Sequence, residues 1–235
     1  MKAVVIAAGI GSRILKETDN IPKTLLPYGN GTILSTILKN IYQVGIRNFI
    51  IVVGYQSRYI KDYLKKNNYF GYDITFIENP RWREGNGISV LITEPEVSKE
   101  DFLLSMSDHI VSFGALKRVA DYKSAKNLLL VDPQTEGIFD IDDATKVLFD
   151  NSRIVDIGKN ISQFNGIDCG IFRLTNRFFE AMREVLKADC DSISAAVNIL
   201  IKNKDMEAVF IEQNESWIDI DTYQAYQYCL NNIKF

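Results

Sequence analysis

The amino terminus combines a short apolar segment with a glycine-rich loop, and this pair of features limits the folds open to the chain. Residues 3–8, Ala-Val-Val-Ile-Ala-Ala, are long enough for one buried strand. The loop Gly9-Ile10-Gly11-Ser12-Arg13 follows, and its glycines let the backbone approach a ligand closely with amide groups pointing outward. Arg13 offers a planar cation suited to phosphate oxygens, and Lys23 brings a second positive charge toward the loop. The segment predicts a cradle for a nucleoside triphosphate.

Two familiar phosphate-binding loops do not match this segment. A dinucleotide-binding loop has a third glycine three residues after Gly11, where this chain has Ile14, and an acidic residue closing the second strand, where it has Gly54-Tyr55-Gln56. A Walker A loop needs Gly-Lys-Ser/Thr, which is absent. A purely structural glycine turn remains an alternative, and the two cations favour the polyphosphate interpretation.

Apolar periodicity predicts an α/β fold. In the first half, predicted strands at 48–53, 74–77 and 102–106 alternate with helices that begin after Thr32 or Thr36 and near residues 57 and 88. This alternation indicates a Rossmann-like three-layer sandwich with a mostly parallel mixed sheet. After about residue 130 we expect a small antiparallel extension, then two helices, a strand and a terminal helix, with strands at 128–131, 145–149, 154–157, 167–174 and 207–211 and helices at 175–186 and 192–202. We expect one domain, residues 1–235, with halves of about 1–130 and 131–235.

Composition excludes some classes of function. The chain has 235 residues and a formal net charge of −3 without a basic block, so a nucleic-acid surface is not expected. No apolar run approaches the roughly 18–20 residues that span a bilayer, and no signal-peptide pattern precedes the first strand, so the protein is not expected to be membrane-embedded. Three widely spaced cysteines, Cys169, Cys190 and Cys229, form no metal or disulfide pattern, which indicates the cytoplasm.

Three carboxylates have the spacing of a metal site. Asp108 follows the predicted strand 102–106, at the carboxyl edge where open α/β sheets bind ligands. Asp219 and Asp221 alternate with isoleucines, so both lie on one face of a strand end. Mg²⁺ prefers one or two carboxylates together with phosphate oxygens and water, which predicts Asp108 with either Asp219 or Asp221. His109, the only histidine, is interpreted as a hydrogen-bonded structural residue rather than a catalytic base.

Three further stretches each have a plain and a functional interpretation. Gly85-Asn86-Gly87 is either a turn or a set of amides that read the edge of a pyrimidine base. Lys159 is either a surface lysine or a contact for an acceptor phosphate. Asp168 lies on a strand whose glycine, Gly170, leaves room for a ligand.

Taken together, these stretches resemble the sugar-phosphate nucleotidyltransferase family, in order and over essentially the whole chain. Within it they look most like the CTP:inositol-1-phosphate cytidylyltransferases. The resemblance implies a GT-A-like nucleotidyltransferase fold whose antiparallel extension lies on the acceptor side. The segments that carry it are Ala7–Arg13, Pro22–Pro27, Gly85–Ser89, Ser107–His109, Ile157–Lys159 and Trp217–Thr222.

The resemblance also implies roles for individual residues. The donor would be held by Ala8, Gly9, Gly11, Ser12 and Arg13, and Lys23 would steady charge on its α-phosphate. Among the further substrate-binding residues Gly85, Asn86 and Ser89, Asn86 would help to select the base. Lys159 would meet the acceptor phosphate, Asp168 its ring hydroxyls, and Asp108 with Asp219 or Asp221 would hold Mg²⁺. The chain departs from the family at Ser107, usually glycine, and at Cys169, threonine in many relatives; the second departure bears on acceptor choice.

The implied function is Mg²⁺-dependent cytidylyl transfer from CTP to inositol 1-phosphate, giving CDP-inositol and pyrophosphate, with Arg13, Lys23 and Lys159 as catalytic residues. Because the sequence ends at Phe235 without the membrane domain fused to some relatives, we expect the product to pass to a separate membrane phosphotransferase. One alternative is a cytidylyl-, uridylyl- or thymidylyltransferase that acts on phosphocholine or a hexose 1-phosphate. An alternative of another class is a non-catalytic nucleotide-sensing module.

Overall fold

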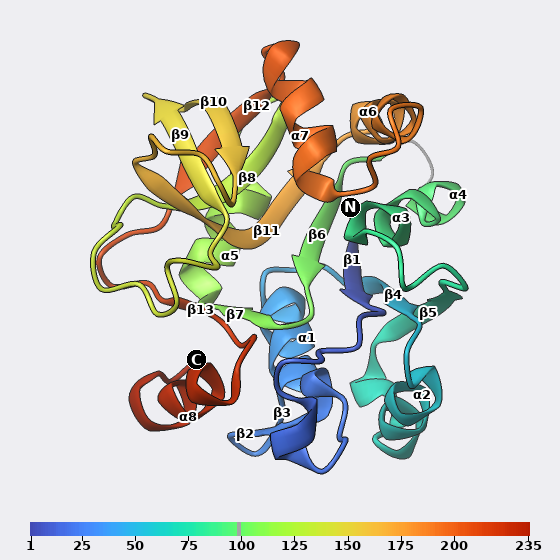
Figure 1. The fold of residues 1–235 in the computed structure, drawn as a ribbon. Coiled ribbons are helices and arrows are strands. Elements are labelled where there is room, and N and C mark those ends of the chain that lie inside the picture. The colour runs from blue at the N-terminus through green and yellow to red at the C-terminus, as the bar shows by residue number, and fades with distance from the viewer. Residues whose placement is uncertain (98–99) are drawn as a thin grey trace.

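A nine-stranded mixed sheet forms the centre of the molecule, with helices on both faces (Figure 1). The computed structural model describes residues 1–97 and 100–235. The strand order is β5-β4-β1-β6-β11-β8-β12-β10-β9, so the sheet runs without a break through both predicted halves. The strands are β1 Lys2–Ala7, β4 Asn48–Val53, β5 Asp73–Glu78, β6 Phe102–Met106, β8 Asn127–Asp132, β9 Lys146–Asp150, β10 Arg153–Gly158, β11 Gly166–Leu174 and β12 Met206–Phe210.

The first four strands of the sheet are parallel, as predicted. β1 pairs with β4 and with β6, and β4 pairs with β5. These strands are connected through α1 (Ile33–Gln43), α2 (Ser57–Lys66), α3 (Asn86–Leu91) and α4 (Glu94–Val97). Thr32 caps α1 through its side chain, which accepts a hydrogen bond from the Ser35 amide, while the Ser35 hydroxyl accepts one from the Thr32 amide. This settles the predicted choice between Thr32 and Thr36.

The second half of the sheet is largely antiparallel. β11 pairs antiparallel with both of its main neighbours, β6 and β8, and β9 and β10 form a hairpin at the edge. β12 is the exception, because it pairs parallel with β8. Three helices accompany these strands: α5 (Phe113–Asp121), α6 (Arg177–Leu186) and α7 (Ile193–Lys202). The predicted mixed sheet with an antiparallel extension is confirmed.

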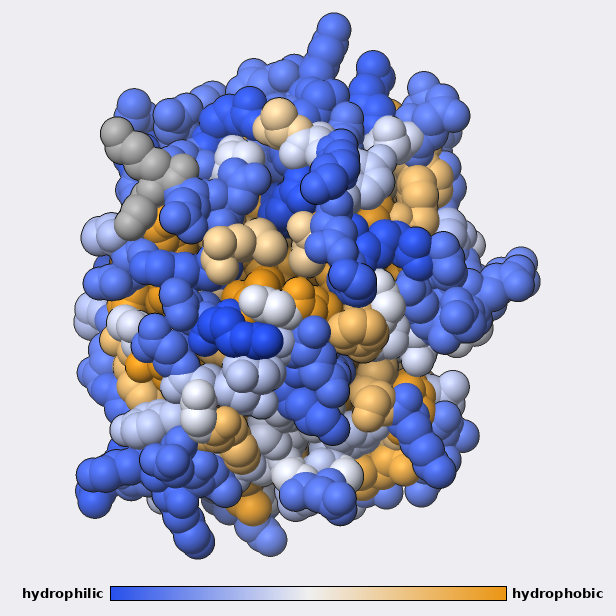
Figure 2. All heavy atoms as spheres, turned by 180° about the vertical axis from the view of Figure 1, so that it is seen from behind, coloured by the Kyte–Doolittle hydropathy of each residue, from blue (hydrophilic) through white to orange (hydrophobic). Residues whose placement is uncertain are grey.

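The sheet has a hydrophobic core on each face. Along β1, Val5 contributes to one core, and Val4, which points to the opposite face, contributes to the other. Helices α1, α2 and α5 cover the first core, and α3, α4, α6 and α7 cover the second (Figure 1). The outer surface seen from behind is mostly hydrophilic, with hydrophobic side chains in small groups (Figure 2). In the described residues, none of the helices is both long and apolar enough to cross a membrane.

A small second sheet brings two distant segments of the chain together at the edge of the central sheet where β6 ends. Strand β7 (His109–Val111) pairs antiparallel with β13 (Trp217–Asp219), so that Asp219 lies opposite His109. This pairing was not predicted, because each strand has only three residues and too little periodicity to be read alone. The terminal helix α8 (Tyr223–Asn232) follows and is capped by the Thr222 side chain. A two-stranded hairpin of β2 (Pro27–Tyr28) and β3 (Gly31–Thr32) precedes α1.

Candidate active site

The candidate site lies where β1 and β6 end, at the carboxyl edge of the parallel strands. The glycine loop follows β1, and Asp108 follows β6, the next strand in the sheet. Lys23 enters from the short 3-10 helix η2 (Lys23–Leu25), and Asp221 from the chain just beyond β13. This edge is the usual position for ligands in open α/β sheets.

The glycine loop is built around Gly11 and Ile14. Gly11 has a φ of +63°, which favours glycine, and a Cβ there would lie 3.2 Å from the Lys23 Cβ, a tight contact. The Gly11 carbonyl accepts a hydrogen bond from the Ile14 amide, and the Ile14 side chain is fully buried. The position that carries a third glycine in a dinucleotide-binding loop therefore anchors this loop in the core.

A cavity of about 170 Å³ lies beside this loop. Its walls also include Tyr55 and Trp82, whose rings are 5.3 Å apart, and both aromatic residues were missed by the sequence analysis. Ser12 is exposed and does not line the cavity. The predicted residues that do line it are Ala8, Gly9, Gly11, Lys23, Asn86, Ser89 and Asp108.

Lys23 holds two of the predicted metal-binding carboxylates. Its side chain is only 11% exposed, and its Nζ donates to Asp108 Oδ2 at 2.6 Å and to Asp221 Oδ1 at 2.5 Å. Burial by itself lowers the pKa of Lys23, but Asp108, Asp221 and then Asp219 outweigh this effect and raise the pKa above its ordinary value. Lys23 is therefore a fixed positive charge at the sheet edge.

Asp108, His109 and Asp219 form a compact cluster whose donor atoms lie within 4.8 Å of one another. His109 Nδ1 donates to Asp108 Oδ1 at 2.8 Å and lies 3.7 Å from Asp219 Oδ1. Burial lowers the pKa of His109, but Asp219 and Asp108 raise it to about 9, so the ring is cationic at neutral pH. Burial also raises the pKa of Asp219, and Asp108 adds to this effect against the opposing pull of His109, to about 7.

This cluster fits a divalent cation. It offers two carboxylates, the ligands that Mg²⁺ prefers, and the buried Asp219 Oδ1 has no hydrogen-bond partner within the described residues. Asp108 and Asp221 differ from Asp219, because both carboxylate oxygens of each pair with cations: those of Asp108 with Lys23 and His109, and those of Asp221 with Lys23 and Arg13. Of the two predicted alternatives, Asp219 has the free ligand atom. The position of His109 beside Asp219 was not predicted from the sequence, because it arises from the pairing of β7 with β13.

Arg13 connects this edge to the antiparallel half of the molecule. Its guanidinium pairs with Asp221 and with Asp143, and Asp143 Oδ1 also accepts from Lys159 Nζ at 2.7 Å. The ionic groups thus form a row in which positive and negative charges alternate, from Lys159 through Asp143, Arg13, Asp221 and Lys23 to Asp108. Three predicted catalytic cations therefore belong to one network, held together by Asp143, which the sequence analysis missed.

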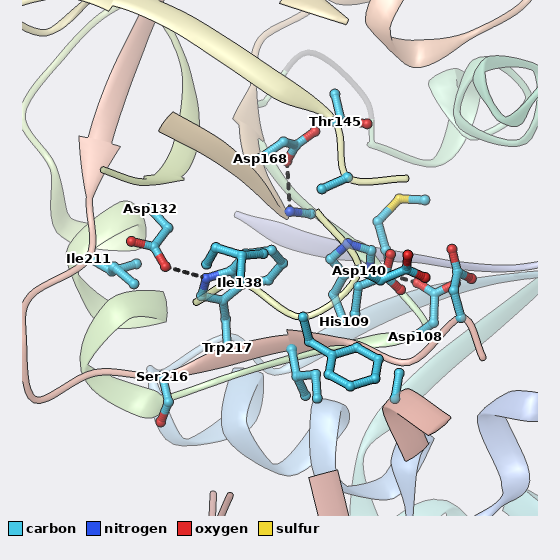
Figure 3. A pocket seen from close by; sticks show the side chains of 18 of the residues that line it. Asp108, His109, Asp132, Ile138, Asp140, Thr145, Asp168, Ile211, Ser216 and Trp217 are labelled. Carbon is cyan, nitrogen blue, oxygen red and sulfur yellow. Dashed lines mark hydrogen bonds and ion pairs between the residues drawn. The ribbon is translucent and has the colours of Figure 1, made fainter. Parts of the chain in front are cut away.

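A second and larger cavity, of about 760 Å³, lies on the antiparallel side and is lined by Lys159 and Asp168. Figure 3 shows Asp168 in this cavity. Asp168 Oδ1 accepts from the Gly170 amide at 2.7 Å, and burial raises the pKa of Asp168 to about 6. A Cβ on Gly170 would lie 2.4 Å from the His109 ring, so this glycine leaves room for a protein side chain. The space beside Gly170 that was predicted for a ligand is therefore occupied by the His109 ring.

Trp217 and Asp132 form another wall of the larger cavity. Trp217 Nε1 donates to Asp132 Oδ2 at 2.8 Å (Figure 3), and the indole stacks near the His109 ring with centroids 6.1 Å apart. Asp132 was not predicted from the sequence, because a buried strand gives no signal that its last residue faces a cavity. Trp217 is only partly buried and lines this cavity.

The Gly85-Asn86-Gly87 loop is held by the segment before α7. The Gly85 amide donates to Asp191 Oδ2 at 2.7 Å and the Gly87 amide to the Asp191 carbonyl at 2.9 Å. Asn86 Oδ1 accepts from the Ile193 amide at 2.9 Å. These three groups are occupied within the protein, whereas the side-chain nitrogen Nδ2 of Asn86 has no hydrogen-bond partner among the described residues and can meet a base.

Ser89 has a supporting position in this region. Its side chain is buried, and its hydroxyl accepts from Asn79 Nδ2 at 2.9 Å. This hydrogen bond fixes the start of α3 behind the smaller cavity.

Comparison with known proteins establishes the family. The sequence profile described as Nucleotidyl transferase matches residues 2–234. The chain therefore belongs to the nucleotidyl transferase family, which confirms the resemblance drawn from its motifs.

Individual known proteins are similar to this chain in sequence or in structure. A protein of Aquifex aeolicus (strain VF5) named bifunctional IPC transferase and DIPP synthase is 31% identical over 223 residues, covering 94% of this chain and 49% of the relative. A second of the same name, from Archaeoglobus fulgidus, is 27% identical over 222 residues, covering 94% of this chain and 41% of the relative. The chain thus spans about half the length of these relatives or less. The solved inositol-1-phosphate CTP transferase from T. maritima has a TM-score of 0.85 at 26% identity, covering 95% of this chain and 90% of that one.

Proposed function

We propose that this chain transfers a cytidylyl group from CTP to the phosphate of inositol 1-phosphate, with Mg²⁺, to give CDP-inositol and pyrophosphate. The observation that carries the proposal is the row of alternating charges that joins the two cavities. It places the donor-side cation Lys23, the acceptor-side cation Lys159 and, between them, Arg13 in one network. Such an arrangement suits a reaction in which two phosphorylated substrates must meet.

The reaction is an in-line attack of an acceptor phosphate oxygen on the α-phosphorus of CTP, with pyrophosphate as the leaving group. The acceptor phosphate is already ionised, so no protein nucleophile is required. Catalysis then depends on alignment and on fixed positive charge near the oxygens that gain negative charge. Lys23 is suited to this task, because its pairs with Asp108 and Asp221 hold the ammonium group in place.

We assign the two cavities to the two substrates. The smaller cavity takes the cytidine nucleotide against Gly9, Gly11 and Asn86. Arg13 lines neither cavity and lies between them in the row of charges, paired with Asp143 and Asp221. The larger cavity takes the acceptor, with its phosphate at Lys159 and its ring hydroxyls at Asp168. Asp168 has no cationic partner in hydrogen-bonding distance among the described residues, so its carboxyl is available to hydroxyl donors.

Asp108 and Asp219 are the residues that would hold Mg²⁺. The bound ion would neutralise phosphate charge and orient the oxygens of the triphosphate. Asp221 keeps Lys23 and Arg13 in position beside this pair. The names of the bifunctional relatives and of the T. maritima structure support inositol 1-phosphate and CTP as substrates.

The test is a panel of substrates with pyrophosphate release as the signal. CTP, UTP, dTTP and ATP are each combined with inositol 1-phosphate, glucose 1-phosphate and phosphocholine. The proposal expects the highest kcat/KM for CTP with inositol 1-phosphate and no turnover after chelation of divalent cations. A preference for another pair identifies one of the alternative transferases. Nucleotide binding without pyrophosphate release from any pair identifies a sensing module.

The cellular setting stays part of the proposal. The three cysteines are free, which supports a reducing compartment such as the cytoplasm. A separate membrane phosphotransferase that consumes the product remains a prediction.

A further inference from the structure

The segment between β8 and β9, residues 133–145, forms one wall of the larger cavity, and we call it the strap. Its Gln134, Ile138 and Asp143 line the cavity, and Ile138 and Asp140 are seen across it in Figure 3. Contacts at several points attach the strap to the rest of the molecule. The Phe139 ring packs on Tyr228 of α8 with centroids 5.2 Å apart, and the Asp143 carboxylate forms ion pairs. The Thr145 carbonyl also accepts a hydrogen bond from the Asp168 amide at 2.9 Å, and the Asp142 carbonyl accepts one from Lys146 Nζ at 3.4 Å.

Asp143 holds two cations with its two carboxylate oxygens. Oδ2 pairs with the guanidinium of Arg13, from the glycine loop, and Oδ1 pairs with Lys159 Nζ at 2.7 Å, from the end of the β10 strand. These cations come from opposite sides of the site, and a two-oxygen anion is what bridges them. A phosphate monoester offers the same pair of oxygens with a larger negative charge. The Asp143 carboxylate thus lies where a phosphate would satisfy both cations.

We infer that Asp143 is an internal competitor for the acceptor phosphate, which must displace it from Lys159 and Arg13 in order to bind. This inference rests on the proposed function for the identity of the acceptor. It concerns the acceptor rather than CTP, because Asp143 and Lys159 line the larger cavity and neither lines the smaller one. Asp143 is therefore a residue that sets acceptor affinity, and it favours acceptors whose charge exceeds that of a carboxylate.

Withdrawal of the carboxylate requires movement of the local turn that carries it. The amides of Asp143 and Ala144 both donate to the Asp140 carbonyl, and Asp140 has a left-handed φ of 58°, so residues 140–144 form one closed turn. Asp143 and its neighbours can move as that turn when the two ion pairs break. All three charged groups are partly exposed, with side chains that are 36% exposed for Asp143, 46% for Arg13 and 51% for Lys159. Pairs of this kind are weak enough for a dianion to replace them.

The expected change in acceptor affinity follows from the weakness of the two ion pairs. An exposed ion pair contributes a factor of up to about 5 to the equilibrium between the paired and the open state of Asp143. With two such pairs, only a minor part of the molecules has Lys159 and Arg13 free to bind phosphate. Removal of the competing charge should therefore tighten acceptor binding about 3- to 10-fold.

Asp143→Asn is the test variant. Asp142→Asn is its matched control, because Asp142 is exposed and its substitution removes one negative charge from the same turn. We expect Asp143→Asn to lower the KM for inositol 1-phosphate about 3- to 10-fold and to change the KM for CTP less than twofold. Asp142→Asn should change neither by more than twofold. An acceptor KM that is unchanged or higher in Asp143→Asn overturns the inference, and so does a decrease confined to CTP.

A second measurement does not depend on turnover. Inorganic phosphate should bind Asp143→Asn about 3- to 10-fold more tightly than the wild type by calorimetry, and it should raise amide hydrogen exchange at residues 140–144 in the wild type. If phosphate behaves in this way but no substrate pair releases pyrophosphate, the proposed function fails and the displacement of Asp143 stands. If cytidylyl transfer is observed but phosphate binds both proteins equally and protects the strap, the inference fails and the proposed function stands.

Discussion

Replacement of Lys23 by alanine should abolish most activity and leave a folded protein. Lys23 is 11% exposed and contacts both Asp108 and Asp221, so the substitution removes the fixed positive charge from the smaller cavity. Loss of one preorganised group that stabilises developing charge costs on the order of 10²–10³ in kcat, or about 2.7–4 kcal/mol. Removal of a buried partner also destabilises the fold. Because Asp221 retains its ion pair with Arg13 and Asp108 its hydrogen bond with His109, we expect the free energy of unfolding to fall by about 1–3 kcal/mol.

The assay follows pyrophosphate release from saturating CTP and inositol 1-phosphate, with urea unfolding of the same samples as the measure of stability. Lys16→Ala is the control, because Lys16 is an exposed lysine of the same segment, and its replacement should leave both quantities unchanged. If the Lys23→Ala protein is folded and retains activity within about threefold of the wild type, the assigned role of Lys23 is wrong.

Three other substitutions test separate parts of the site. Asp108→Ala should lower the turnover rate by about 10²–10³ with the protein still folded, and near-wild-type turnover would refute a role in metal or phosphate binding. Asp168→Asn should stabilise the protein by about 1–3 kcal/mol at pH 7.5 and lower acceptor affinity. The folded-state pKa of Asp168, about 6, lies above the ordinary 3.8, so the wild type loses stability as pH rises from about 4 to 6. At pH 3.5 the two proteins should therefore show no difference in the free energy of unfolding. Gly11→Ala should cost about 1–2 kcal/mol of stability because of its φ of +63°, whereas Gly9→Ala, with open space around the Cβ position, should cost less; equal losses in urea unfolding would contradict this reasoning.

The sequence was most informative where a residue's role is set by its own segment. The strands 48–53 and 102–106 were predicted to the residue, because their β-branched and apolar runs are bounded by clear turn signals. The glycine loop and Lys23 were predicted together, because the loop follows a buried strand and must open at its carboxyl edge. Positions of this kind follow from periodicity and from the geometry of parallel sheets.

The sequence was least informative where a role depends on pairing between distant segments. The different positions of Asp219 and Asp221 follow from the register of β13 against β7, which places Asp219 opposite His109. Alternation alone gave both residues the same face. The hydrogen bond from the Trp217 indole N–H to Asp132, the last residue of β8, likewise joins segments that are far apart in the sequence.

Asp143 illustrates the same limit on the acceptor side. In the sequence it belongs to a short acidic run, Asp140-Ile141-Asp142-Asp143, which has the appearance of a solvated turn. Its partners, Arg13 and Lys159, are 130 and 16 residues away. The loop at Gly85 and Asn86 illustrates the opposite case, in which polar groups with a proposed ligand-binding role are used within the protein. The Gly85 amide bonds to Asp191, and Asn86 Oδ1 bonds to the Ile193 amide.

Transfer of an isotopic label tests the central claim most directly. Inositol 1-phosphate with ¹⁸O in its phosphate is incubated with CTP, Mg²⁺ and the purified protein, and both products are analysed by mass spectrometry. Attack by the acceptor phosphate on the α-phosphorus predicts CDP-inositol that retains every labelled oxygen and pyrophosphate that contains none. Absence of CDP-inositol, or appearance of the label in pyrophosphate, would contradict the proposed reaction.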